Sequence, residues 1–181
     1  PTLLERATSE IVAQLEAWQV LGKEKTVLDL GCGIGRIACA IAPMVRDVHG
    51  IDVSKGMIDI ARKRCEPQTN VHLLKTTGHD LRDFSDEMFD TVIAVDTFPY
   101  INQSGAALVE SHFSEMRRVL KSGGDLVILN YSYRGDDAAD LHDVRRLGTE
   151  YGFDVVTAGE HPFSIWNGSA FHLRKRGARR A

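Results

Sequence analysis

One glycine-rich segment constrains the fold more than any other part of the sequence. Residues 26–30 form a short apolar run, and Gly31, Gly33 and Gly35 separate it from an amphipathic run. This order predicts a strand buried on both faces, a tight turn and the start of a helix. In an open α/β sheet, a ligand can approach backbone N–H groups and a helix N-terminus together at such a turn.

The spacing of the glycines narrows the choice of ligand. A dinucleotide-binding loop has the pattern G-x-G-x-x-G, and Arg36 occupies the position of its third glycine here. A phosphate-binding P-loop needs Lys followed by Ser or Thr after its last glycine, and the sequence lacks this pair. The loop therefore disfavours an NAD-dependent enzyme and excludes a P-loop.

Two acidic residues close to the loop suggest what it binds. Asp29 precedes Gly31 by two residues, and its carboxylate is expected to face the ligand, where it suits an ammonium group and repels phosphate. Asp52 lies at the end of the next predicted strand, in reach of a ribose diol. The two acids together favour an adenosyl amino acid over a nucleotide.

Predicted strands and helices alternate along the rest of the chain. The predicted strands are 26–30, 48–52, 71–74, 90–95, 125–130, 154–157 and 169–174, and the predicted helices are 2–21, 36–45, 55–65, 104–120 and 137–151. This alternation predicts an α/β fold with a doubly wound parallel sheet, helices on both faces and an antiparallel final pair of strands. Ser54 and Ser104 are expected to cap helices, and residues 122–124 to end one.

Composition sets the broad class of the protein. The chain has 181 residues with 22 Lys and Arg against 25 Asp and Glu, which is typical of one globular domain. No apolar run approaches the ~20 residues of a membrane span, and the N-terminal segment does not resemble a signal peptide. We therefore expect a cytoplasmic protein. Cys32, Cys39 and Cys65 lack the spacing of a zinc site, so no metal is predicted.

Charge is unevenly distributed along the chain. The last eight residues hold five basic side chains, at 174, 175, 176, 179 and 180, and the remaining residues hold 17 basic and 25 acidic side chains. Nucleic-acid affinity depends on clustered Lys and Arg, so this acidic body disfavours a nucleic-acid partner. We expect the basic tail, residues 177–181, to be a solvated terminus, with contact to RNA or an acidic surface as the alternative.

The ordered motifs resemble those of the class I S-adenosylmethionine-dependent methyltransferases. The matching segments are Val27–Gly35, Asp52, Phe89–Ala94, Arg118–Gly124 and Gly152–Phe153. The resemblance implies a seven-stranded Rossmann-like sheet with an antiparallel last strand and S-adenosylmethionine as cofactor. The methyltransferase domain is then expected over residues 26–176, with residues 1–25 forming an amphipathic helix that is part of a lid over the acceptor.

The resemblance also implies roles for individual residues. The implied cofactor-binding residues are Asp29, Gly31, Cys32, Gly33 and Asp96 around the methionyl end, Asp52 at the ribose, and Val53, Met57, Gly78 and His79 around adenine. Asp80, near the last of these, is left without a firm role. Asp96 and Tyr100 are the catalytic candidates, because they belong to the segment expected to face the reacting methyl group. A packing role for the Tyr100 ring remains equally open.

Other residues near these motifs refine the expected chemistry. Many small-molecule relatives have Glu-His where this chain has Pro99-Tyr100, which weakens a metal-assisted or histidine-base mechanism here. The segment also lacks the N-P-P-Y tetrad associated with methylation of nucleic-acid bases. His112 is interpreted as a core histidine on a helix face. Residues 130, 131 and 133 (Asn, Tyr and Tyr) are the candidates for a substrate wall.

The leading hypothesis is a methyltransferase that acts on a small or cationic molecule. A sulfonium methyl group is already activated, so positioning suffices, and a general base is needed only for a protonated acceptor. Two alternatives remain: a cofactor-binding partner subunit without its own catalysis, and an RNA or protein methyltransferase. The sequence leaves the acceptor and the oligomeric state open.

Overall fold

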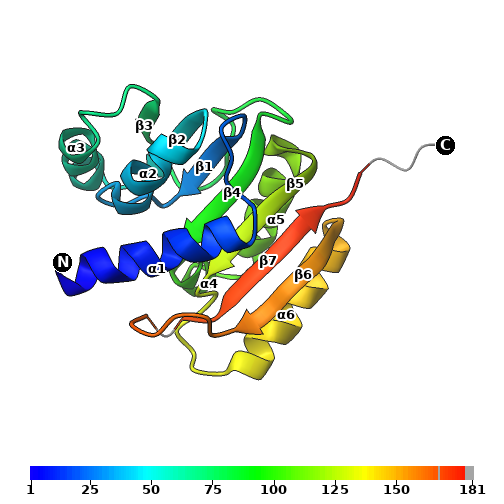
Figure 1. Cartoon of the computed structure of the whole chain (residues 1–181). Coiled ribbons are helices and arrows are strands. Elements are labelled where there is room, and N and C mark those ends of the chain that lie inside the picture. The colour runs from blue at the N-terminus through cyan, green and yellow to red at the C-terminus, as the bar shows by residue number, and fades with distance from the viewer. Residues whose placement is uncertain (167, 178–181) are drawn as a thin grey trace.

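The computed structural model describes residues 1–166 and 168–177, and it forms a sheet with helices on both faces (Figure 1). The strands are β1 (Thr26–Leu30), β2 (Asp47–Asp52), β3 (Val71–Lys75), β4 (Phe89–Val95), β5 (Leu120–Leu129), β6 (Phe153–Glu160) and β7 (Ala170–Lys175). The helices are α1 (Leu3–Ala17), α2 (Arg36–Ile41), the 3-10 helix η1 (Ala42–Met44), α3 (Lys55–Arg64), α4 (Phe98–Gln103), α5 (Ala106–Val119) and α6 (Asp137–Glu150).

The sheet has seven strands in the order β3-β2-β1-β4-β5-β7-β6. The first five strands in this order are parallel to one another, whereas β7 is antiparallel to both β5 and β6. This arrangement confirms the predicted doubly wound sheet and its antiparallel last strand. The strand order reverses between β1 and β4, and in such sheets the crevice at the carboxyl ends of these strands is where ligands bind.

Alternating side chains divide the core between the two faces of the sheet. On β4, Val92 and Ala94 face a cluster completed by α4, α5 and α6, whereas Ile93 faces a cluster completed by α1 and α2. The period-2 alternation of strand side chains produces this division. All five residues of β1 are buried, as expected for a central parallel strand covered on both sides.

Several predicted boundaries are wrong, and local contacts explain why. Ser54 caps α3 as predicted, accepting a hydrogen bond from the Met57 N–H. Ser104 does not cap the next helix, because residues 98–103 form the separate helix α4 and Gly105 lies at the N-cap of α5. The segment Ser122–Gly124 does not end α5, because Leu120 is already extended and begins β5.

The C-terminal basic residues divide between the sheet and the end of the chain. Arg174 and Lys175 belong to β7, and Arg174 pairs with Asp125 at 2.9 Å while Arg176 pairs with Asp154 at 2.8 Å. Of the predicted tail, residues 178–181, with Arg179 and Arg180, lie outside the described residues. Among the helices of the described part of the chain, none has the length and apolar character needed to cross a bilayer.

Helix α1 is anchored in the core through a short apolar stripe. It begins at a capping box formed by Thr2 and Glu5, and it ends at Ala17, earlier than the predicted residue 21. Ile11 and Leu15 are fully buried, and they belong to the cluster beneath α1 and α2. The helix therefore contributes to the stability of the domain.

We expect Ile11→Ala to lower the free energy of unfolding by about 2–5 kcal/mol, because it removes buried methyl groups and leaves a cavity. Leu3→Ala, on the same helix, is the matched control: Leu3 is 68% exposed, so its effect should stay within about 0.5 kcal/mol. Urea denaturation of both variants measures the difference. Equal stability of the two variants would contradict the docking of α1.

Candidate active site

A cavity of about 590 Å³ lies at the carboxyl ends of β1, β2 and β4. Its walls include most of the predicted site residues: Gly31, Gly33, Asp52, Val53, Met57, Gly78, His79, Asp96 and Tyr100. Thr97, Ser104, Leu108 and His112 also line it and were not predicted as site residues. The largely apolar wall with a few convergent polar groups is typical of a small-molecule site.

The glycine loop requires its glycines for two different reasons. Gly31, Gly33 and Gly35 all have positive φ angles, of 72°, 52° and 75°, in the region that favours glycine. A Cβ on Gly31 would collide with the side chain of Thr97, whose hydroxyl donates to the Leu30 carbonyl at 2.8 Å. A Cβ on Gly33 would meet no atom within 4 Å, so at Gly33 the backbone conformation alone demands glycine.

Asp52 links the glycine loop to the end of β2. One carboxylate oxygen accepts the Gly33 N–H at 2.9 Å, and the other accepts the Ser54 N–H at 2.8 Å. These two bonds fix the orientation of a half-buried carboxylate that lines the cavity. Each oxygen keeps a second lone pair, so the pair can still accept two hydrogen bonds from a ligand diol.

Asp29 and Cys32 lie behind the loop instead of lining the cavity. Asp29 is 2% exposed and accepts the Ala38 N–H at 3.1 Å, and its burial raises the pKa of its carboxyl to about 7. The Cys32 side chain is buried, which raises the pKa of its thiol, and its N–H donates to the Ile51 carbonyl. The expected exposure of Asp29 to a ligand ammonium is therefore absent, since this carboxyl holds the start of α2.

Asp96 is held by two side chains from distant segments. One oxygen accepts from the Asn130 amide at 2.9 Å, and the other accepts from the Trp166 indole N–H at 3.0 Å. Asp96 and Asn130 follow β4 and β5, and both have positive φ angles, of 56° and 68°. Such conformations are costly for non-glycine residues and concentrate at functional sites.

The tyrosines of the predicted substrate wall have different positions. Tyr100 is 63% exposed and lines the cavity, and the exposed Tyr133 ring meets it edge to face at a centroid distance of 5.9 Å. The pKa of Tyr133 is raised to about 12. Desolvation of its hydroxyl is the larger cause, and the hydrogen bond to Tyr100 is the next. Tyr131 is buried and stacks on Phe98, so its predicted wall position is wrong. Tyr131 joins the cluster of Ile128 instead of that of Leu129, because the left-handed conformation of Asn130 interrupts the alternation of the strand.

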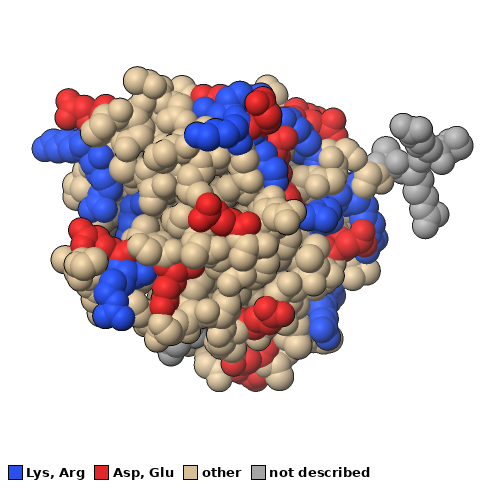
Figure 2. Space-filling view, viewed as in Figure 1, with Lys and Arg blue, Asp and Glu red and all other residues tan. Residues whose placement is uncertain are grey.

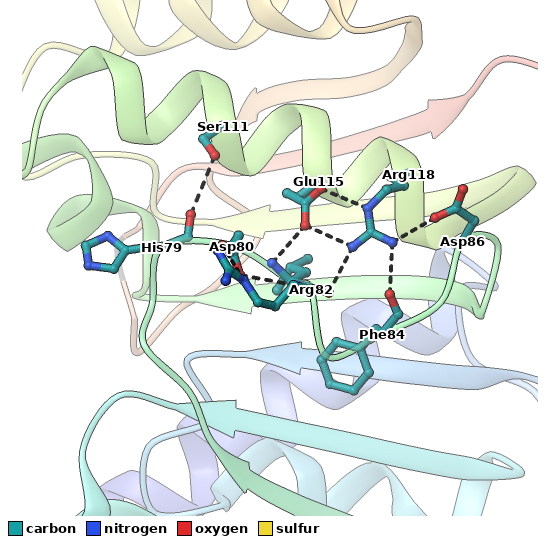
Figure 3. A network of polar contacts seen from close by, with 9 residues as sticks. His79, Asp80, Arg82, Phe84, Asp86, Ser111, Glu115 and Arg118 are labelled. Atoms are coloured by element: carbon teal, nitrogen blue, oxygen red, sulfur yellow. Dashed lines mark hydrogen bonds and ion pairs between the residues drawn. The ribbon is translucent and has the colours of Figure 1, made fainter.

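A polar network holds the segment after β3 against α5 (Figure 3). Glu115 accepts the Leu81 N–H at 2.9 Å, and Arg118 bonds both Glu115 and the Leu81 carbonyl. A second hollow of about 670 Å³ lies along this network, but charged side chains line it and it does not reach the glycine loop. The network therefore positions the wall that contains Gly78 and His79.

His112 lies within this wall, on α5. It is 2% exposed, and its Nδ1 lies 2.9 Å from the Leu108 carbonyl, which agrees with the prediction of a buried histidine with a satisfied hydrogen bond. Its position on the cavity surface was missed, as was the bond of Trp166 to Asp96. Helical spacing indicates burial but does not distinguish a core from the floor of a cavity.

Comparison with known proteins identifies the family. The model of a methyltransferase domain family matches residues 28–128, which covers β1 to β5 and the glycine loop. The chain belongs to this family. The fold and the motifs place it among the class I S-adenosylmethionine-dependent methyltransferases. The predicted family and cofactor class are thereby confirmed.

Individual relatives differ in how much they share with this chain. A demethylmenaquinone methyltransferase of Tropheryma whipplei is 37% identical over 107 residues, 59% of this chain and 42% of the relative. An O-methyltransferase of Aspergillus nomiae is 35% identical over 129 residues, 68% of this chain and 52% of the relative. The chain thus spans about half the length of these relatives.

Solved structures share the fold over almost the whole chain. A SAM-dependent methyltransferase from Aquifex aeolicus superposes with a TM-score of 0.70 at 20% identity, covering 96% of this chain and 92% of that structure. At this identity the likeness concerns the fold alone. It agrees with the strand order and the antiparallel β7 described above.

We expect Asp29→Asn to stabilise the protein at pH 8 but not at pH 4. Because the pKa of Asp29 is higher in the folded protein than in the unfolded chain, protonation of this carboxyl stabilises the folded state. This stabilisation is fully present below about pH 4 and is lost as the pH rises through about 7. Asparagine stays neutral and its amide oxygen still accepts the Ala38 N–H, so the gain is at most about 4 kcal/mol.

Thermal unfolding across this pH range tests the prediction. Asp83→Asn, which changes an exposed carboxyl, serves as the control and should show no such gain. A variant at Asp29 that is less stable than the wild type at pH 8 would contradict the assignment of a buried, desolvated carboxyl.

Proposed function

We propose that this chain is an S-adenosylmethionine-dependent methyltransferase that acts on a small-molecule acceptor. The observation that carries the proposal is the fixed Asp52 carboxylate, which lies beside the glycine loop on the wall of a cavity large enough for a nucleoside-sized ligand. Family membership supports the reaction class. The geometry of the surrounding walls supports the size of the acceptor.

The residues of the cavity fit an adenosyl amino acid. The open space beside Gly33 gives a ligand access to the loop, and Asp52 offers two carboxylate oxygens to the ribose hydroxyls. Val53 and Met57 are exposed apolar side chains on the wall, where they suit one face of a planar base. A Cβ on Gly78 would collide with Val53, so this glycine keeps the two walls of the base site close.

The reaction then requires alignment more than proton transfer. When bound, S-adenosylmethionine supplies a methyl group activated by a positively charged sulfur. The chain must orient an acceptor in line with that group and exclude water, and such positioning supplies several kcal/mol of barrier reduction. Asp96 is suited to a positioning role, because Asn130 and Trp166 fix both of its oxygens beside the cavity. Tyr100 is suited to contact the acceptor.

Two distant segments, α1 and the β6–β7 connection, are joined to each other near Asp96. Glu10 on α1 accepts hydrogen bonds from the Ser164 and Ile165 N–H groups at 3.1 Å, in the β6–β7 connection that also contains Trp166. Arg36, at the start of α2, donates to Thr8 on α1 at 3.0 Å. We infer that α1 and this connection form part of the acceptor wall, which favours a compact acceptor.

Surface charge and the relatives also favour a small acceptor. On the face seen in Figure 2, basic and acidic side chains are interspersed around a broad area that has neither, without a continuous basic stripe. Curated relatives include a demethylmenaquinone methyltransferase and a ubiquinone biosynthesis O-methyltransferase, whose names indicate small organic acceptors. Both observations argue against an RNA methyltransferase.

We expect Asp52→Asn to weaken the binding of S-adenosylhomocysteine about 10- to 100-fold, because an NH₂ group replaces one of the two charged acceptors. Asp59→Asn is the matched control: this exposed carboxyl on α3 pairs with Lys55 and does not line the cavity. Isothermal titration calorimetry measures both affinities, and a melting curve confirms folding. Equal binding by both variants would contradict the proposed cofactor site.

Methyl transfer itself should be detected with a panel of small phenols, thiols and amines. The measured quantity is S-adenosylhomocysteine formed from S-adenosylmethionine, with total RNA and a protein extract as comparison acceptors. We expect turnover with at least one small acceptor and none with RNA. Turnover with RNA or protein alone would overturn the acceptor class, and cofactor binding without any turnover would favour the partner subunit.

A further inference from the structure

The inner end of the cavity is formed by α5 and by the segment after β3. Along α5 the lining passes from Leu108 to His112, and the facing segment contributes Gly78 and His79. The Ser111 hydroxyl donates to the His79 carbonyl at 3.5 Å, which joins the two sides. Figure 3 shows this contact, with the His79 ring extending away from the network. His112 therefore lies at the end of the cavity proposed for adenine.

One tautomer of His112 is fixed by its helix. Its Nδ1 lies 2.9 Å from the Leu108 carbonyl, and because a carbonyl only accepts hydrogen bonds, Nδ1 carries the proton. In the neutral ring, Nε2 is then an acceptor. Burial lowers the pKa of His112, and the neighbouring charges of Glu115, Asp80 and His79 have smaller effects. The ring is thus neutral at pH 7 and presents a single acceptor atom.

The carboxylate of Asp80, in the segment after β3, is engaged elsewhere. Both oxygens of Asp80 accept from Arg82 Nε at 2.9 Å, and Asp80 does not line the cavity. A purine amino group bound at this end is costly to leave without a hydrogen-bond partner. His112 is the titratable side chain from α5 that lines this end of the cavity.

We propose that His112 is a specificity residue that accepts a hydrogen bond from the 6-amino group of adenine. This inference rests on the proposed function, because it assumes that an adenosyl ligand occupies the cavity. The fixed tautomer makes the site selective for a 6-amino purine over a 6-oxo purine. A 6-oxo purine would direct a carbonyl oxygen at the Nε2 acceptor, and two acceptors cannot bond each other.

The test compares two ligands that differ only at this position. S-Adenosylhomocysteine carries the 6-amino group, and S-inosylhomocysteine carries oxygen in its place. We expect the wild type to bind the amino form at least about 10-fold more tightly. His112→Gln places an amide at similar reach, and because the amide can present either oxygen or NH₂, it should reduce this preference to about 3-fold or less.

His72→Gln is the matched control, since this half-exposed histidine is on β3 and does not line the cavity. It should keep the wild-type preference. Calorimetric titration of the three proteins with both ligands gives the ratios, and far-ultraviolet circular dichroism confirms that each is folded. A general structural role of His112 would weaken both ligands equally and leave the ratio unchanged.

The outcomes separate this inference from the proposed function. A wild-type preference that is lost in His112→Gln and kept in His72→Gln supports the role of His112. Binding of S-adenosylhomocysteine with the same preference in all three proteins overturns it and leaves the proposed function intact. A wild type that binds neither ligand overturns the proposed function and this inference together.

Discussion

The two hydrogen bonds accepted by Asp52 connect the glycine loop to the end of β2, and the candidate cofactor site depends on them. The loop has three residues in the left-handed region, and its backbone hydrogen bonds include one from the Gly35 N–H to the Cys32 carbonyl at 2.9 Å and one from the Cys32 N–H to the Ile51 carbonyl at 2.9 Å. The Asp52 carboxylate accepts a hydrogen bond from the Gly33 N–H, and the buried Asp29 carboxyl accepts one from the Ala38 N–H near the start of α2. Both acids thus hold the loop in a shape that leaves Gly33 open to a ligand.

A second set of contacts shapes the opposite end of the cavity. Asp96 and Asn130 are both in strained conformations at the ends of neighbouring strands, each at a cost of about 1–3 kcal/mol, and they bond each other. Trp166 completes the group from the β6–β7 connection, which Glu10 in turn ties to α1. The burial of the apolar cluster beneath α1 and α2 offsets this strain, so the two strained residues can persist beside a stable sheet.

The sequence alone predicts the sheet and the glycine loop, because both depend on local patterns. The alternation of strands and helices, the spacing of the glycines and the acid at Asp52 can each be recognised within a short stretch of sequence. Each of them is present in the structure. The predicted exposure of Asp29 to the ligand fails because strand periodicity does not reveal how deep a carboxyl lies. Trp166 and Asp96 are 70 positions apart, so no local pattern indicates their contact. The same limit hides the place of His112 at the cavity surface.

A structure of the protein with S-adenosylhomocysteine bound tests the central claim most directly. The account predicts both ribose hydroxyls within hydrogen-bond distance of the Asp52 carboxylate, with the Gly33 and Ser54 bonds to that carboxylate intact. It also predicts the purine against Val53 and Met57. A ligand bound outside this cavity, or a ribose that makes no contact with Asp52, would contradict it.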